Sequence, residues 1–135
     1  MRHRCSIALM ALALSVSATG TGAAPKSDTI KVRVDPKGAL VGSSIDVTVR
    51  VKCAPFGEHF ESNITVTQDD QSISAQRGLP VVQCDSRWHG YTVRATPFEG
   101  SFHPGRAFAS AYVSRLDPET GDLRQGQDSR TIRVR

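Results

Sequence analysis

The sequence predicts an all-β fold: an immunoglobulin-like Greek-key β-sandwich of about seven strands with one disulfide, preceded by a signal-peptide helix. One observation behind this prediction is the strict alternation of apolar and polar residues in short segments, without the 3.6-residue period of a capped helix. A second is the recurrence of Gly, Pro and Asp turn signals between these segments. The third is a signal-like N-terminus followed by a single pair of cysteines. We therefore divide the chain into a signal peptide, residues 1–23, and one sandwich domain, residues 24–135.

The N-terminus has the three regions of a secretory signal peptide. Arg2 and Arg4 precede an apolar run over residues 7–14, which is about half the roughly 20 residues that a membrane-spanning helix needs. Small residues follow, and Thr21-Gly22-Ala23 fits a cleavage site that leaves Ala24 as the first mature residue. We expect a secreted, extracellular protein, free or associated with the cell wall, with no membrane span in the mature chain.

The charge of the mature chain is small. Loss of Arg2 and Arg4 leaves 15 of the 17 basic residues against 13 acidic ones, a formal charge of +2, which argues against a nucleic-acid partner. One or two basic residues fall on each predicted strand, a pattern that is typical of solvated outer faces. They are Lys31, Arg33, Arg50, Lys52, Arg94, Arg130, Arg133 and Arg135.

Removal of the signal also removes Cys5 and leaves Cys53 and Cys84 as a pair. A lone cysteine pair in an exported chain is expected to be oxidised, and closing a loop of this length stabilises a fold by about 3–4 kcal/mol. The alternative is a metal or redox pair. Neither cysteine has a second thiol nearby, which favours the structural disulfide.

Alternation defines the strands of the first half of the domain. Residues 30–35 carry Ile and Val on one side, and Pro36-Lys37-Gly38 is predicted to end this strand. Residues 45–53 show the cleanest alternation, with Cys53 on the core side. Residues 63–67 follow after a turn at residues 54–57, and Asp69-Asp70-Gln71 indicates another turn.

Shorter strands are predicted next. Residues 72–76 and 80–84 alternate on either side of a break at Gly78. Residues 88–97 carry Tyr91, Val93 and Ala95 on one face. Each segment is long enough to form a strand of a sandwich.

The last two predicted strands form a hairpin. After a corner at Pro104-Gly105, residues 107–113 place Ala and Val on one face and Phe108 and Tyr112 on the other, so that both faces are partly covered. Residues 117–122, with the sequence DPETGD, have the composition of a turn between antiparallel strands. Residues 131–135 then bury Ile132 and Val134.

The residues that carry chemistry do not form a recognisable catalytic motif. His59, His89 and His103 lack metal-ligand spacing, and no nucleophile motif surrounds the many Ser and Thr residues. We therefore expect no enzyme activity, no catalytic residue, no metal site and no cofactor. A hydrolase is the enzyme alternative.

Aromatic residues in or beside loops are the candidate binding residues. Phe56, Trp88 and Phe102 are the three that we select, and Phe60 and Phe98 have similar positions. Such side chains form a binding surface or plug the ends of a sandwich whose strands carry small aliphatic residues. We favour plugging.

Three motifs carry a resemblance to a known group of proteins. They are Val47-x-Val49-x-Val51-x-Cys53, then Val82-Gln83-Cys84-Asp85 with His89-x-Tyr91-x-Val93, then Phe102-x-Pro104-Gly105-x-Ala107-x-Ala109-x-Ala111-Tyr112. From Thr29 to Arg135 the chain resembles small secreted proteins of actinobacteria with an immunoglobulin-like domain of unknown function. The resemblance implies fold and location, and it implies no catalytic residue.

The expected function is that of a secreted, non-enzymatic, monomeric module that binds a protein, a glycan or a component of the cell envelope through its loops. One alternative is a carrier of a small hydrophobic ligand, in which the loop aromatics line a cleft. Another is an inhibitor of extracellular proteases that presents the late hairpin to the enzyme.

Overall fold

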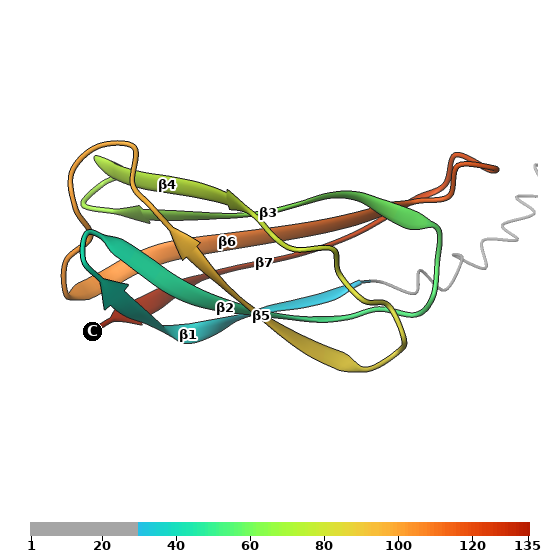
Figure 1. The fold of residues 1–135 in the computed structure, drawn as a ribbon, viewed down its shortest axis with the longest axis horizontal. Helices are drawn as coiled ribbons and strands as arrows, with labels where there is room; N and C mark the ends of the chain where they lie inside the picture. The colour runs from blue at the N-terminus through green and yellow to red at the C-terminus, as the bar shows by residue number, and fades with distance from the viewer. Residues whose placement is uncertain (1–29) are drawn as a thin grey trace, which may run out of the picture.

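The computed structural model describes residues 30–135, which form seven β-strands (Figure 1). The strands are β1 (Lys31–Val41), β2 (Ser44–Lys52), β3 (Glu58–Gln68), β4 (Ile73–Gly78), β5 (Trp88–Ala95), β6 (Gly105–Leu116) and β7 (Leu123–Val134). The predicted all-β fold is therefore confirmed. The predicted signal peptide and its helix, residues 1–23, lie outside the described residues.

The strands form two layers that are joined along one seam. β4, β3, β6 and β7 are neighbours in one layer, and β1, β2 and β5 are neighbours in the other (Figure 1). The seam is a short parallel pairing of β1 with β7, in which Lys37 is opposite Arg133 and Gly38 is opposite Val134. All other neighbouring strands of the described region are antiparallel. The chain changes layer after β2, β4 and β5, as expected for a Greek key.

β1 does not end at Pro36, as the sequence predicts, but continues to Val41. An irregularity between Val34 and Gly38 shifts its register against β2, and the second half of the strand reaches β7. The Val34 N–H donates to Asp128 Oδ2 of β7 at 2.8 Å. Proline has no N–H and is tolerated at such a bulge, so Pro36 bends the strand instead of ending it.

Residues 80–84, predicted as a strand, have no strand structure. Their backbone groups bond to side chains instead: Tyr91 Oη accepts from the Gln83 N–H at 2.8 Å, and the Val82 carbonyl accepts from Arg115 at 3.3 Å. The predicted pairing of Cys53 with Cys84 is confirmed, and the disulfide ties this segment to the end of β2. The disulfide and the side-chain hydrogen bonds hold this segment in place of the backbone hydrogen bonds of a sheet.

Two strands are longer than predicted. β3 begins at Glu58 instead of residue 63, with a bulge between His59 and Glu61. β7 begins at Leu123 instead of residue 131, because its first half pairs with β6 throughout, from Leu123 opposite Leu116 onward. This half has no apolar alternation, so only the hairpin partner makes it a strand.

The core between the layers consists mainly of Val, Ile and Ala. β2 contributes Ile45, Val47, Val49 and Val51, none of which has exposed surface, and burial of each side chain stabilises the fold by about 1.5–3 kcal/mol. Phe102 is 3% exposed, and its N–H donates to the Ser43 carbonyl, so it closes the end of the core beside the β1–β2 turn.

The turns predicted at Asp69-Asp70-Gln71 and at residues 117–122 are confirmed. At residues 117–122 the Asp117 N–H donates to the Asp122 carbonyl, and Gly121 has a φ of 75°. At residues 69–72 the Ser72 N–H donates to the Asp69 carbonyl at 3.0 Å and joins β3 to β4.

Candidate functional site

The outward side of the β4-β3-β6-β7 layer carries no charged side chain over most of its area. Strand register places rows of Ser, Thr, Asn, Gln, Phe and Tyr side by side on this side. We call this surface the neutral face. Its residues are Asn63, Thr65, Thr67, Ser74, Gln76, Phe108, Ser110, Tyr112, Gln125, Gln127, Ser129 and Thr131.

Hydrogen bonds link several side chains of the neutral face to one another. Ser110 Oγ lies 2.8 Å from Ser129 Oγ, across the β6–β7 pair. Gln127 Nε2 lies 3.5 Å from both hydroxyl oxygens. Tyr112 Oη donates to Gln125 Oε1 at 2.9 Å, so the phenol is directed along the face. The polar groups are therefore ordered before any ligand arrives.

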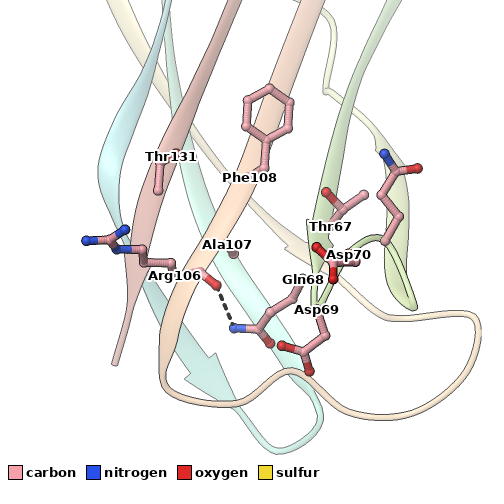
Figure 2. A pocket seen from close by; sticks show the side chains of 9 residues that line it. Thr67, Gln68, Asp69, Asp70, Arg106, Ala107, Phe108 and Thr131 are labelled. Atoms are coloured by element: carbon pink, nitrogen blue, oxygen red, sulfur yellow. Dashed lines mark hydrogen bonds between the residues drawn. The ribbon is translucent and has the colours of Figure 1, made fainter.

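Phe108 is the main exposed apolar side chain of the neutral face. It is 48% exposed and lies between Thr67 of β3 and Thr131 of β7 (Figure 2). Its ring is therefore accessible to a ligand on this face.

A hollow of about 370 Å³ lies beside Phe108, at the end of the neutral face (Figure 2). Its other walls come from the β3–β4 turn and from the β6 and β7 ends. The residues around it are Thr67, Gln68, Asp69, Asp70, Gln71, Arg106, Ala107, Phe108 and Thr131. Carboxylate, guanidinium, amide and hydroxyl groups thus surround one aromatic ring.

The turn that borders the hollow has an uncommon backbone. Asp69, Asp70 and Gln71 have φ values of 53°, 51° and 70°. Asp tolerates this left-handed conformation because its short side chain bonds locally, whereas Gln71 is strained by about 1 kcal/mol. Strain of this kind persists where the surrounding structure holds the backbone in place.

Gln68 and His103 brace the turn against the loop before β6. Gln68, which is 3% exposed, donates through Nε2 to the His103 carbonyl at 2.8 Å and accepts the His103 N–H at 2.9 Å. His103 Nδ1 lies 3.0 Å from the Pro104 carbonyl oxygen, and Nε2 lies 2.6 Å from Asp69 Oδ2. Because the Pro104 carbonyl and then the Asp69 carboxylate favour the protonated ring, they raise the pKa of His103 above its usual value.

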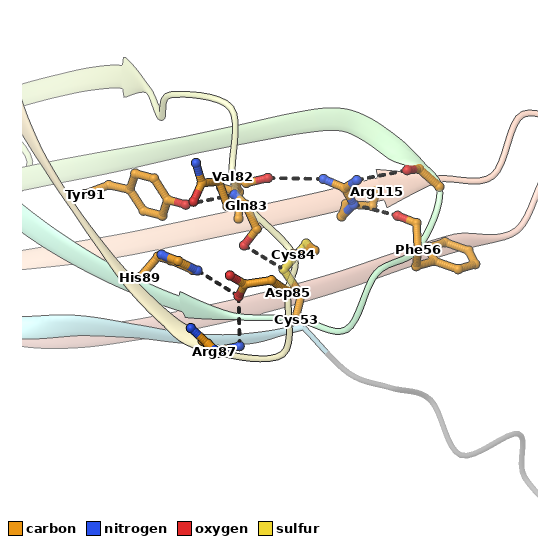
Figure 3. Close-up of a disulfide and its surroundings, with 11 residues drawn as sticks. Cys53, Phe56, Val82, Gln83, Cys84, Asp85, Arg87, His89, Tyr91 and Arg115 are labelled. Carbon is orange, nitrogen blue, oxygen red and sulfur yellow. Dashed lines mark hydrogen bonds and ion pairs between the residues drawn. A yellow bond between two sulfur atoms is a disulfide. The ribbon is translucent and has the colours of Figure 1, made fainter.

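A second polar network lies at the opposite end of the sandwich, around the disulfide (Figure 3). Arg115 donates to the carbonyls of Phe56 at 2.6 Å, Gly57 at 2.9 Å and Val82 at 3.3 Å. One guanidinium therefore holds the loop after β2 and the segment before β5.

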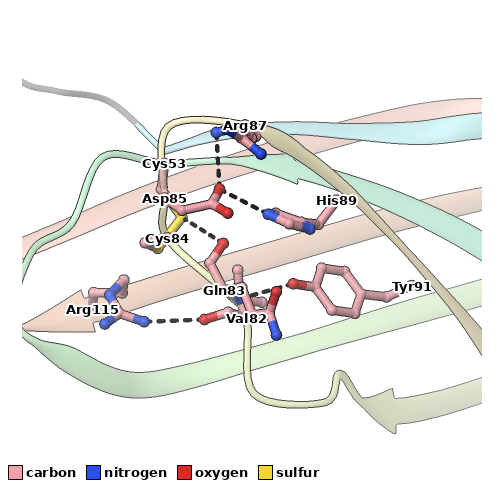
Figure 4. A network of polar contacts seen from close by, with 9 residues as sticks. All are labelled: Cys53, Val82, Gln83, Cys84, Asp85, Arg87, His89, Tyr91 and Arg115. Carbon is pink, nitrogen blue, oxygen red and sulfur yellow. Dashed lines mark hydrogen bonds and ion pairs between the residues drawn. A yellow bond between two sulfur atoms is a disulfide. The ribbon is translucent and has the colours of Figure 1, made fainter.

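Asp85 and His89 form an acid–base pair in the same region (Figure 4). His89 Nε2 lies 2.8 Å from Asp85 Oδ1, and this hydrogen bond is the main reason that the pKa of Asp85 is lowered. Asp85 also accepts the Arg87 N–H at 3.0 Å. Within residues 30–135 the two cysteines, Cys53 and Cys84, are joined in the disulfide, so neither is a free thiol.

The structure does not bring the three selected aromatic residues together. Phe102 is buried at one end of the core, whereas Trp88, at the start of β5, is 42% exposed at the other end. Phe56 is half-buried, and Arg124 lies over its ring at 3.7 Å. Phe102 fits the expected plug. The prediction of binding residues omits Phe108 and Tyr112, although these two residues alternate with the alanines of β6 and lie on the opposite face of that strand.

No protein-family model matches the chain, and no curated protein matches it. Within residues 30–135 there is no group of three or more His, Cys, Asp or Glu residues that could hold a metal ion. The same residues contain no helix that is long and apolar enough to span a membrane.

Proposed function

We propose that this protein is a secreted, non-enzymatic binding module whose neutral face holds an uncharged glycan chain of the cell envelope. The observation that carries the proposal is a broad, ordered, uncharged face with the exposed ring of Phe108 in it. The predicted signal peptide and the disulfide between Cys53 and Cys84 support export to an oxidising compartment.

The chemistry of the neutral face fits a sugar better than a protein. Hydroxyl and amide groups both donate and accept hydrogen bonds, as the hydroxyls of a sugar also do. An exposed aromatic ring can stack on the C–H face of a sugar ring. The core of a protein–protein interface is more apolar, whereas Phe108 and the Tyr112 ring are the main apolar groups here.

Affinity electrophoresis tests the proposal. The purified protein is run in native gels that contain neutral α-glucan, β-glucan, mannan or galactan, and its mobility is compared with that in an empty gel. We expect retardation by at least one of these polymers. Phe108→Ala should weaken binding about tenfold, because it removes a stacking contact worth about 1–1.5 kcal/mol.

Trp88→Ala provides the matched control. Trp88 is about as exposed as Phe108, at 42% against 48%, but lies on the other layer. This variant should bind like the wild type, and 0.5 M NaCl should leave binding to an uncharged chain unchanged. Unaltered mobility in all four polymers would contradict the proposal, as would a wild-type dimer that Phe108→Ala converts to a monomer.

The two other functions expected from the sequence remain open to direct assays. A carrier of a small hydrophobic ligand should acquire bound ligand from culture medium, detectable by native mass spectrometry. A protease inhibitor should slow secreted proteases through the β6–β7 hairpin, whose turn is at residues 117–122.

A further inference from the structure

The β1-β2-β5 layer gathers four basic residues that the sequence distributes over two strands. Strand register places Lys31 directly opposite Lys52, and Arg33 directly opposite Arg50. The two pairs are successive rows on the outward side of the sheet. We call these four residues the basic patch.

This arrangement costs stability. Like charges directly opposite each other on antiparallel strands repel, and each such pair destabilises a sheet. Arg50 has one partner, because its Nε lies 3.1 Å from Asp35 Oδ1. Among residues 30–135, Lys31 and Lys52 form no ion pair.

The next rows of the same layer, between β2 and β5, pair side chains that attract each other. Asp46 accepts two hydrogen bonds from Arg94, at 2.9 and 3.1 Å, and this contact lowers the pKa of Asp46. Thr48 and Thr92 share a hydroxyl hydrogen bond of 2.7 Å in the next row. Among the outward residues of this layer, the opposed like charges are therefore Lys31–Lys52 and Arg33–Arg50; across β6 and β7, Arg106 is also opposite Arg133.

Trp88 borders the basic patch. It lies opposite Lys52 on β5, and the Arg33 guanidinium carbon is 5.3 Å from the centre of its ring. Trp88 is 42% exposed, so a ligand in solution can contact its ring and the neighbouring cations together. An indole ring beside cations can contact the apolar part of an anionic ligand while the cations bind its charges.

We propose that the basic patch binds a linear anionic glycopolymer, a polysaccharide or polyol chain that bears phosphate or carboxylate groups. Such a chain neutralises the repulsion between the opposed cations. Outward residues two apart on a strand are about 6.5–7 Å apart, so the two rows match charges that repeat along a polymer. The guanidinium groups of Arg33 and Arg50 can each bind a phosphate or carboxylate in bidentate geometry.

The basic patch is on the opposite layer from the neutral face, so this inference does not rest on the proposed function. A nucleic acid is a poorer fit, because the patch offers four cations and one exposed aromatic ring, while the expected charge of the mature chain is only +2.

The probes are poly(glycerol phosphate) and polygalacturonate, measured by isothermal titration calorimetry at low salt. We expect binding to at least one polymer, and an increase from about 50 to 200 mM salt should weaken it about tenfold or more. The double variant Lys31→Gln/Lys52→Gln should lose about twenty-five-fold in affinity, about fivefold per charge. Because it removes an opposed pair, its melting temperature should be equal to or higher than that of the wild type.

Two control variants test whether the loss of affinity is specific to the basic patch. Arg94→Gln removes a charge on the same layer that Asp46 already neutralises, and should change affinity less than twofold. Phe108→Ala lies on the other layer and should bind the anionic polymers like the wild type, whether or not neutral glycans bind.

Four results would overturn the inference. The first is that neither polymer binds at low salt, and the second is that Arg94→Gln and the double lysine variant lose affinity equally. The third is tighter binding to single-stranded oligothymidylate than to both polymers. The fourth is binding only to vesicles that contain phosphatidylglycerol. The last two outcomes would assign the patch to nucleic acid or to a lipid surface instead.

Discussion

His103 connects the β3–β4 turn to the loop before β6 through two acceptors, the Pro104 carbonyl and the Asp69 carboxylate. Both interactions favour the charged ring, so its pKa in the folded protein is above the unfolded value of 6.5. A raised pKa stabilises the fold fully below the unfolded pKa, and this contribution is lost as pH rises through the folded pKa.

The resulting prediction concerns the pH dependence of stability. We expect the melting temperature of the wild type to exceed that of His103→Gln at pH 5.5, and the difference to shrink by pH 8.5. Thermal unfolding followed by circular dichroism at several pH values measures it. A wild-type advantage that stays constant with pH would contradict this role of His103.

For single residues, the sequence predicts which face of a strand a side chain occupies, but not which distant residue it contacts. Alternation correctly separates Phe108 from the buried alanines of β6, but it predicts that both faces are partly covered, whereas Phe108 is 48% exposed. It could not show that Asp69 meets His103, because 34 positions separate them and only the paired strands bring both loops to the same end. The same limit hid the opposition of Lys31 and Lys52.

The segment between β4 and β5 is held by side chains and by the disulfide, and Arg115 joins it to the loop after β2. The guanidinium donates to three carbonyls from two loops. If Arg115 is lost, the carbonyls of Phe56 and Val82 lose a charged donor, and a hydrogen bond to a charged group contributes about 1.5–3 kcal/mol.

We therefore expect Arg115→Met to lower the free energy of unfolding by about 2–3 kcal/mol. Guanidinium unfolding with the disulfide intact measures the change. Arg50→Met is the matched control, because its single exposed ion pair with Asp35 contributes about 0–1 kcal/mol. Equal stability of the two variants would show that the segment does not depend on Arg115.

The strands that sequence alone predicts well are those with a buried apolar face, such as β2. Residues 80–84 alternate in the same way, yet they form no strand, and side chains bond their backbone instead of a neighbouring strand. The first half of β7 shows the reverse: its polar residues form a strand because β6 supplies the partner. The alternation of apolar and polar residues predicts a strand reliably only where the apolar face of that strand is buried.

At the scale of the whole molecule, the disulfide restricts the conformations that the unfolded chain can adopt. It joins the end of β2 to the segment that leads into β5, across 31 positions. Replacing both cysteines by alanine should lower the free energy of unfolding by about 3–4 kcal/mol, the value for a closed loop of this length.

Urea unfolding of Cys53→Ala/Cys84→Ala measures this change, and the wild type under reducing conditions should show a similar loss. Because the fold keeps its core, we expect the double variant to retain the native circular dichroism spectrum at low temperature. A loss below about 1 kcal/mol would mean that the unfolded chain is already restricted without the bond.

The composition of the whole chain does not show how its charged residues are distributed between the two layers. The expected charge of the mature chain, +2, indicates no strong charge on either layer, whereas the fold gives one layer a mostly uncharged outward face and places opposed cations on the other. Strand alternation tells which residues point outward, and layer assignment decides which of them become neighbours. This is why the fold class could be predicted, while both candidate surfaces required the structure.

The parallel seam between β1 and β7 also has a consequence for the order of folding. It pairs Lys37 with Arg133, so its closure joins nearly the two ends of the described region and has a high entropic cost. The β6–β7 hairpin needs only its six-residue turn at 117–122 and can form within microseconds. We expect β1 to dock last, on a timescale of milliseconds to seconds, which would make its arrival at β7 the step that completes the native protein.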